Sequence, residues 1–187
     1  MALLATSRQT GIAAVITVAL LHSIVLGGGR RVVMADLRAM AEELGYRNCR
    51  TLVSTGNLVF ETERSPTGDI ERALEAAFEK RFGKHVDIIV RTGSDWLKLA
   101  AGNPFPARDG SEIAVRVMRT PLDESVLGLL ERHRGEETIA VVDGDLWVDF
   151  GGKASGTRLL SAMTTKKLGI GTSRNANTVA GLAEMIG

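Results

Sequence analysis

The stretch from Leu52 to Phe60 constrains the fold more than any other part of the chain. It reads Leu-Val-Ser-Thr-Gly-Asn-Leu-Val-Phe, two short apolar runs separated by a polar turn. Gly56 and Asn57 tolerate positive φ and therefore permit a tight reversal, while β-branched and aromatic flanks favour strands. Because the apolar runs are nearly continuous, the stretch predicts a β-hairpin at a central position of a sheet with at least one covered face.

Apolar periodicity on either side of the hairpin predicts the neighbouring elements. Residues 16–21 are an apolar run typical of a buried strand, and residues 86–90 form a similar run. Residues 34–44 and 69–82 carry apolar side chains at the spacing of amphipathic helices, and a glycine follows each segment. The order strand, helix, strand, strand, helix, strand is that of a ferredoxin-like split βαβ unit.

The order begins again after a short helix at 94–101 and a rigid Asn-Pro-Phe-Pro connector. The predicted elements are a strand at 113–118, a helix at 123–133, a hairpin of 138–142 and 146–150 about an Asp-Gly turn, a helix at 157–168 and a closing helix from 175. The closing helix takes the place of a final strand. The expected fold class is α+β, with two ferredoxin-like halves and mainly antiparallel sheets packed with helices.

The predicted organisation consists of a disordered extension at 1–15, an N-terminal half at 16–92, a helix and connector at 93–110, and a C-terminal half at 111–187. The apolar stretch of residues 11–26 also has the look of a signal-peptide core, but it is too short to span a bilayer. We therefore expect a buried first strand and no membrane association. The lone Cys49 excludes an intramolecular disulfide and fits a reducing cytoplasm.

Charge is distributed unevenly, although the net charge is only +1. Residues 1–60 carry a net +3, residues 61–150 a net −6 and residues 151–187 a net +4. If the two ends of the chain meet in space, they place a basic patch beside an acidic body. The small net charge and the aromatic content of 4% argue against a general nucleic-acid binder.

Short motifs along the globular part resemble those of an uncharacterised bacterial family, domain of unknown function 1697. Those near the start are Ala19-Leu20-Leu21, Gly27-Gly28, Arg31-Val32, Met34-x-x-Leu37 and Glu43-Leu44-Gly45. The later ones are Ser54-x-Gly56-Asn57-x-Val59-Phe60, Arg91-Thr92, Asn103-Pro104-Phe105 and Thr172-Ser173-Arg174-Asn175-x-Asn177-Thr178-Val179. The resemblance implies a two-part α+β fold of ferredoxin-like halves and implies no activity.

The chain departs from the family pattern at three positions. After the first strand the family usually runs Arg-Gly-Ile-Asn-Val-Gly-Gly, and here His22 and Val25 stand at its Arg and Asn positions. In the final motif, Ala176 stands where the family commonly has Trp. If those groups form a site in the family, this chain has lost part of it.

Three polar, glycine-rich loops are candidates for a ligand site. We expect a small anionic ligand, such as a nucleotide, to bind where they converge. The residues are Gly27, Gly28, Arg30 and Arg31 in the first loop, Ser54 and Asn57 in the hairpin turn, and Arg174, Asn175 and Asn177 near the end. The alternative is structural: the turn residues satisfy local hydrogen bonds, Asn175 caps the last helix, and Arg174 pairs with an acidic residue.

A weaker candidate is the loop Gly151-Gly152-Lys153-Ala154-Ser155-Gly156-Thr157, which lies between a predicted strand and helix. It fails the phosphate-loop pattern because Trp147 and Ala154 occupy two required positions. Backbone N–H groups with Gly152, Lys153 and Arg158 could still hold an anion, although the sequence favours an ordinary loop.

The sequence contains no complete catalytic motif and predicts neither a cofactor nor a metal site. The three histidines are far apart, and no serine sits in a nucleophile elbow. Cys49 is expected to be a buried structural thiol. Whether the protein is an enzyme stays undecided, and the alternatives to small-ligand binding are nucleic-acid binding through the sheet and a protein-interaction or structural role.

Overall fold

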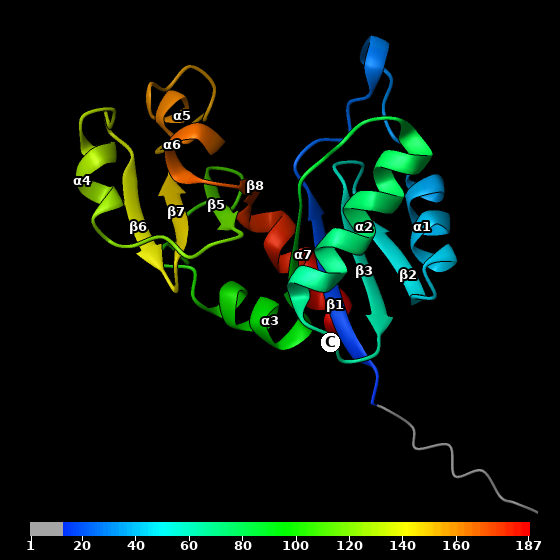
Figure 1. The fold of residues 1–187 in the computed structure, drawn as a ribbon. Coiled ribbons are helices and arrows are strands. Elements are labelled where there is room, and N and C mark those ends of the chain that lie inside the picture. The colour runs from blue at the N-terminus through cyan, green and yellow to red at the C-terminus, as the bar shows by residue number, and fades with distance from the viewer. Residues whose placement is uncertain (1–12) are drawn as a thin grey trace, which may run out of the picture.

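The first half of the chain forms a four-stranded sheet covered by two helices (Figure 1). A computed structural model describes residues 13–187. The strands are β1 (Val15–Leu21), β2 (Arg47–Leu52), β3 (Asn57–Thr62) and β4 (Ile88–Thr92), in the order β2-β3-β1-β4 with antiparallel neighbours. The helices are α1 (Met34–Glu43) and α2 (Thr67–Phe82).

The second half repeats this topology. Its strands are β5 (Ile113–Met118), β6 (Thr138–Val142), β7 (Asp145–Asp149) and β8 (Gly171–Asn175), in the antiparallel order β6-β7-β5-β8. The helices in this half are α4 (Val126–Glu131), α5 (Leu159–Ala162) and α6 (Thr165–Leu168). The remaining elements are a 3-10 turn at Gly27–Gly29, α3 (Gly93–Ala101) and α7 (Ala176–Ile186).

The α+β fold of two ferredoxin-like halves is confirmed, but three predicted elements of the second half are wrong. A fourth strand, β8, precedes the closing helix, so the helix is an addition rather than a replacement. The helix expected at 157–168 is two short helices, because Met163 and Thr164 have non-helical backbone angles. The helix expected at 123–133 covers only Val126–Glu131.

The hairpin of the first half is confirmed, with β3 in the central position that was expected. β2 is instead an edge strand, and its exposed arginines and irregular register are features that discourage pairing with another chain. The disordered extension predicted for residues 1–15 lies, up to residue 12, outside the described residues. Val15 already belongs to β1.

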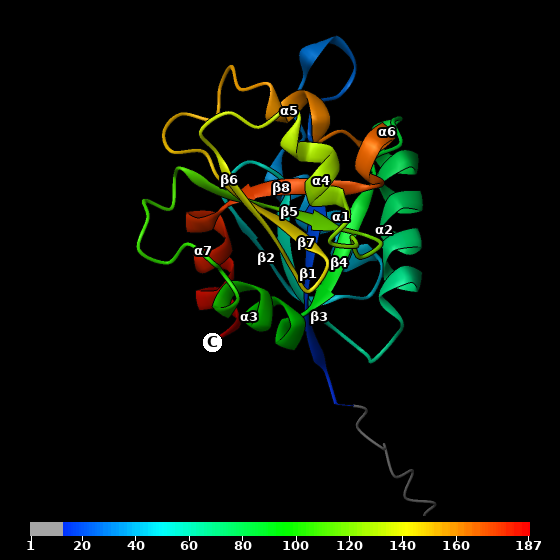
Figure 2. The same cartoon turned by 90° about the vertical axis from the view of Figure 1, so that its left-hand side faces the viewer.

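The two sheets share one apolar layer (Figures 1 and 2). One face of each sheet packs on its own helices, and α3 and α7 lie between the two sheets. The largest buried side chains of this middle layer are Trp96 from α3 and Trp147 from β7. Trp96 Nε1 donates to the carbonyl oxygen of Val179 over 3.2 Å, which ties α3 to α7.

The turn between β2 and β3 approaches the end of β1 closely enough to require glycine at position 56. Gly56 has φ +83°, and a Cβ there would lie 2.8 Å from Ile24 Cγ2 and 2.9 Å from Leu21 Cβ. The Leu21 N–H also donates to the Gly56 carbonyl oxygen over 2.9 Å. These contacts fix the turn against the segment that follows β1.

We predict that Gly56→Ala destabilises the protein by about 2–4 kcal/mol, because it combines a left-handed backbone with overpacking. Gly83→Ala is the matched control, since Gly83 has φ +71° with no atom within 4 Å of the added Cβ. The control should lose only about 1–2 kcal/mol. Urea unfolding of the two variants measures both values, and equal losses would contradict the close approach at Gly56.

Candidate functional site: a basic pocket between the two halves

A pocket of about 430 Å³ lies where the end of β1 meets the free edge of β8. The first half contributes the segment after β1, the turn before β3 and one arginine, and the second half contributes β5 and β8. The lining residues are His22, Ser23, Ile24, Val25, Arg31, Thr55, Arg116, Thr172, Ser173 and Arg174. Three of them are arginines and none is acidic, so the pocket is basic.

The free edge of β8 presents backbone groups to this pocket. Because β8 is the last strand of its sheet, alternate residues point their backbone groups away from β5. The outward carbonyl of Gly171 accepts from His22 Nδ1 over 3.0 Å, and that of Ser173 accepts from Arg174 Nη1 over 2.9 Å. The Ser173 N–H points the same way as its carbonyl, which adds a backbone donor at this edge.

Arg174 joins the two halves underneath the pocket. Its side chain is only 8% exposed and reaches from β8 into the turn before β3. Nη2 donates to the carbonyl oxygens of Leu21 (2.9 Å), Thr55 (3.3 Å) and Gly56 (3.4 Å), and Nε donates to Asn57 Oδ1. Arg174 therefore holds the halves together through neutral acceptors and not through the acidic partner that was expected.

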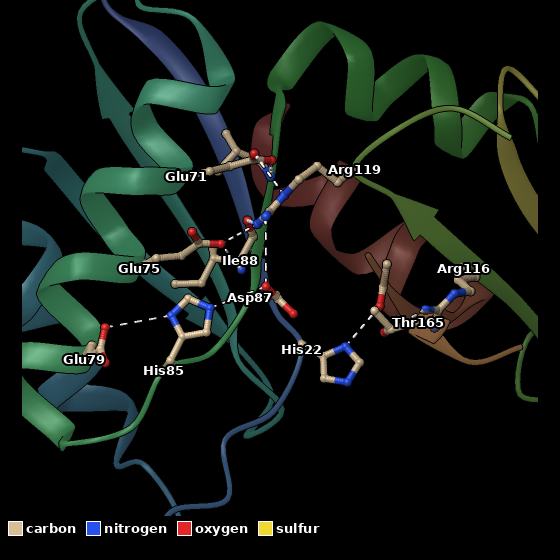
Figure 3. Close-up of polar contacts among 12 residues, drawn as sticks. His22, Glu71, Glu75, Glu79, His85, Asp87, Ile88, Arg116, Arg119 and Thr165 are labelled. Atoms are coloured by element: carbon tan, nitrogen blue, oxygen red, sulfur yellow. Dashed lines mark hydrogen bonds and ion pairs between the residues drawn. The ribbon is translucent and has the colours of Figure 1, made fainter. Parts of the chain in front are cut away.

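Arg116 belongs to β5, where it pairs with Ser173 of β8, and it is 5% exposed. Its Nη2 donates to Gly169 O over 3.2 Å and to Thr165 Oγ1 over 3.4 Å, both long hydrogen bonds. Its buried Nε has no hydrogen-bond partner among the described residues. Figure 3 shows the Arg116 guanidinium directed toward Thr165, with His22 of the first half across the interface from them.

Neither buried arginine pairs with a carboxylate in the part of the chain that the structure describes. Within residues 13–187, the ion pairs formed by arginines do not include Arg116 or Arg174. Burial lowers the pKa of the Arg174 guanidinium to about 10 and lowers the pKa of Arg116 in the same direction. Both remain positively charged at neutral pH, so the pocket encloses two poorly solvated cations.

Two neighbouring arginines on the same interface, Arg91 and Arg119, differ from Arg116 and Arg174 because both pair with carboxylates. Arg119 reaches between Glu71 and Glu75 of α2 and donates to Ile88 O over 2.8 Å (Figure 3). Arg91 lies 3.3 Å from Asp145, whose carboxylate also accepts from the Met118 N–H over 2.7 Å. Burial raises the pKa of both Glu71 and Asp145.

These ion pairs border a second hollow of about 350 Å³, which has both signs of charge in its wall. Its cations are Arg91, Lys98 and Arg119, and its anions are Asp95, Asp143 and Asp145. Arg91 pairs with Asp145 and Lys98 with Asp143, and the cations of the wall equal its anions in number, so this hollow offers a ligand no net charge.

The hydroxyl groups of the basic pocket are arranged as donors. Ser23 Oγ accepts from the Val25 N–H, Thr55 Oγ1 from Asn57 Nδ2, and Thr172 Oγ1 from Arg174 Nη1. A hydroxyl that accepts one hydrogen bond still has its own proton to donate. The pocket therefore combines cations with hydrogen-bond donors and has no carboxylate in its lining.

The structure brings together only part of the residues predicted from the sequence. Arg31 and Arg174 line the pocket, and Asn57 lies fully buried beneath it. Gly27, Gly28 and Arg30 are exposed in the adjacent loop, and Ser54 is exposed in the turn, but none of them lines the pocket. Asn175 caps α7 by accepting from the Thr178 N–H over 2.8 Å, and Asn177 is exposed outside the pocket.

The secondary anion loop also lies apart from the pocket. Lys153 and Arg158 are exposed and Gly152 is partly buried, in the connection between β7 and α5. A helix as short as α5, with four residues, offers little dipole to an anion. Within residues 13–187, no group of three or more His, Cys, Asp or Glu has the arrangement of a metal site.

Sequence reasoning missed Arg116 and the hydroxyl residues of the pocket. Arg116 interrupts the apolar run of β5, and a charged residue inside a buried strand was the signal that could have identified it. The hydroxyls carry no such signal, because Ser and Thr are common in turns and edges.

A protein-family model matches residues 16–147, more than half of the 187 residues, and its description is "Protein of unknown function (DUF1697)". The chain belongs to this family. No curated protein matches it. The solved structure of conserved bacterial protein SP0830 from Streptococcus pneumoniae is similar, with 21% sequence identity and a TM-score of 0.69 over 94% of this chain and 100% of that one. At this identity the similarity shows the fold alone.

Two of the three departures from the DUF1697 pattern lie in the pocket. His22 and Val25 both line it, whereas Ala176 opens α7 outside it. The pocket wall of this chain therefore has an imidazole and an isopropyl group at the two positions where the resemblance predicts a guanidinium and an amide. Among the described residues, no helix is both long and apolar enough to cross a membrane.

We predict that Asn57→Ala lowers the free energy of unfolding by about 2–4 kcal/mol, because it leaves the buried hydrogen-bonding partners of Asn57 unsatisfied. The amide Nδ2 donates to Leu52 O over 3.0 Å and Thr55 Oγ1 over 2.9 Å, and Oδ1 accepts from Arg174. Ser54→Ala, in the exposed part of the same turn, should change stability by less than about 0.5 kcal/mol. A urea titration measures both variants, and a loss for Asn57→Ala as small as that of the control would show that the network is not stabilising.

We also predict that Cys49 reacts slowly with iodoacetamide in the native protein. Burial, with a smaller effect of Glu42, raises the pKa of the Cys49 thiol to about 11. At pH 8 the reactive thiolate is then scarce, and alkylation should be about tenfold or more slower than in the denatured protein. The rate is measured by mass spectrometry, and equal rates in the two states would contradict a protected structural thiol.

Proposed function

We propose that the basic pocket binds a small anionic ligand. The observation that supports this most directly is the pair of buried arginines, Arg116 and Arg174, which meet at one pocket without any carboxylate to balance them. Burying a charge is unfavourable unless it is paired, and proteins therefore place unbalanced buried charges where a ligand completes them. Arg31 adds a third cation at the exposed rim of the pocket.

The geometry favours a small molecule over a polymer. A volume of about 430 Å³ is typical of a metabolite site. In residues 13–187, both faces of each sheet are covered by buried apolar side chains, so neither sheet offers an open face for single-stranded nucleic acid. Nucleic-acid binding through the sheet is therefore disfavoured.

The test compares two adjacent exposed arginines, of which only one lines the pocket. We expect inorganic phosphate to raise the melting temperature, because a ligand at ten times its dissociation constant stabilises the native state by about 1.4 kcal/mol, or about 3–5 °C. Arg31→Ala should weaken phosphate binding about tenfold, since it removes a charge-assisted contact. Arg30→Ala is the matched control, because Arg30 is exposed outside the pocket and should leave binding unchanged.

Thermal melts over a phosphate titration give the affinity of each variant at fixed ionic strength. Arg116→Met is the complementary variant, and it should abolish phosphate stabilisation while the apo protein remains folded by circular dichroism. If Arg116→Met does not fold, the comparison of Arg31→Ala with Arg30→Ala still tests whether the pocket binds phosphate. Equal phosphate affinities for Arg31→Ala and Arg30→Ala, or no stabilisation of the wild type, would overturn the proposal.

A further inference from the structure

We infer that the ligand of the basic pocket is a phosphorylated polyol, of the chemical class of sugar phosphates, and not a nucleotide. The inference rests on the proposed anion site and narrows the class of anion. The inference is drawn from the pocket residues other than the arginines, because these residues must contact the part of the ligand to which the phosphate is attached.

The wall has almost nothing on which a nucleobase could stack. No Phe, Tyr or Trp lines the pocket, and its one aromatic ring is the imidazole of His22. The Nδ1 atom of His22 is committed to Gly171 O over 3.0 Å. Stacking on aromatic rings is a main source of affinity for bases, and this pocket supplies little of it.

The wall is also poor in the acceptors that the amino groups of a base require. Two carbonyl oxygens that are bonded by lining residues already accept hydrogen bonds, that of Gly171 from His22 and that of Leu21 from Arg174. The lining has no carboxylate or carboxamide side chain. The lining therefore offers more donors than acceptors, which favours a ligand rich in acceptor oxygens over a base with N–H donors.

A sugar fits the same wall well. Its hydroxyl oxygens can accept from the free protons of Ser23, Thr55 and Ser173, while its C–H groups contact the apolar side chains of Ile24 and Val25. The phosphate then lies at the basic part of the wall, where the exposed Arg31 can donate to its oxygens and the buried Arg116 and Arg174 add positive charge. The division into basic, hydroxyl and small apolar parts matches the three parts of a sugar phosphate.

Calorimetric titration with four probes tests the inference at one ionic strength: inorganic phosphate, ribose, ribose 5-phosphate and adenosine 5′-phosphate. The last two differ at C1 of the sugar, where adenine replaces the anomeric hydroxyl. We expect ribose 5-phosphate to bind at least tenfold more tightly than phosphate, ribose alone to give no detectable binding, and the adenine base to improve affinity by less than about threefold.

The outcomes separate this inference from the proposed function. Tenfold tighter binding of adenosine 5′-phosphate than of ribose 5-phosphate would overturn the polyol class and leave the anion site standing. Equal affinities for phosphate and ribose 5-phosphate would also overturn the polyol class, because the sugar would then contribute nothing to binding, and would leave the anion site standing. If none of the three phosphates binds, the proposed function itself fails.

A variant pair checks the role of the hydroxyl wall. Ser173→Ala removes an exposed hydroxyl of the pocket, and Ser54→Ala removes an exposed hydroxyl outside it. Ser173→Ala should weaken ribose 5-phosphate about threefold or more while phosphate affinity changes less, and Ser54→Ala should change neither. An unchanged ratio of the two affinities in Ser173→Ala would contradict recognition of the sugar by this wall.

Discussion

The apolar layer that the two sheets share is the constraint on which the rest of the structure depends. Each sheet needs cover on both faces, and each has helices of its own for only one face. The other two faces are buried against α3 and α7, with Trp96 and Trp147 filling the space between them. Because close-packed interiors resist deformation, this buried layer fixes the sheets in one mutual position. That position brings the end of β1 against the edge of β8 and creates the basic pocket.

Charge is distributed along the interface between the halves in two different ways. Near α2 and β4, the arginines of the interface meet the carboxylates of Glu71, Glu75 and Asp145. At the edge of β8, Arg174 and Arg116 meet carbonyl and hydroxyl oxygens only. Buried ion pairs of the first kind specify how the halves dock. Of the buried cations of the second kind, Arg174 is stabilised by several neutral oxygens, whereas Arg116 has two hydrogen bonds, both of them long. At one end of the interface the arginines are paired with carboxylates, and at the other end, in the part of the chain that the structure describes, they are not.

The sequence predicted the fold class, the family and the hairpin, because apolar periodicity and turn residues are local signals. It did not predict β8, since Gly-Thr-Ser-Arg-Asn has no apolar pattern and forms a strand only because β5 lies beside it. The candidate site was predicted in part. Arg31 and Arg174 were chosen for their charge and do line the pocket, but Arg116 and the burial of Asn57 depend on contacts between distant segments, which no local pattern records.

The contacts of Arg174 have a kinetic consequence. They join positions 117 and 153 residues apart, to Asn57 and to the Leu21 carbonyl, so forming them closes long loops late in assembly. Interactions that form after the folding transition state act mainly on the unfolding rate. If the proposed anion binds between the halves, it would slow their separation, lengthen the lifetime of the native state and leave the rate of folding nearly unchanged.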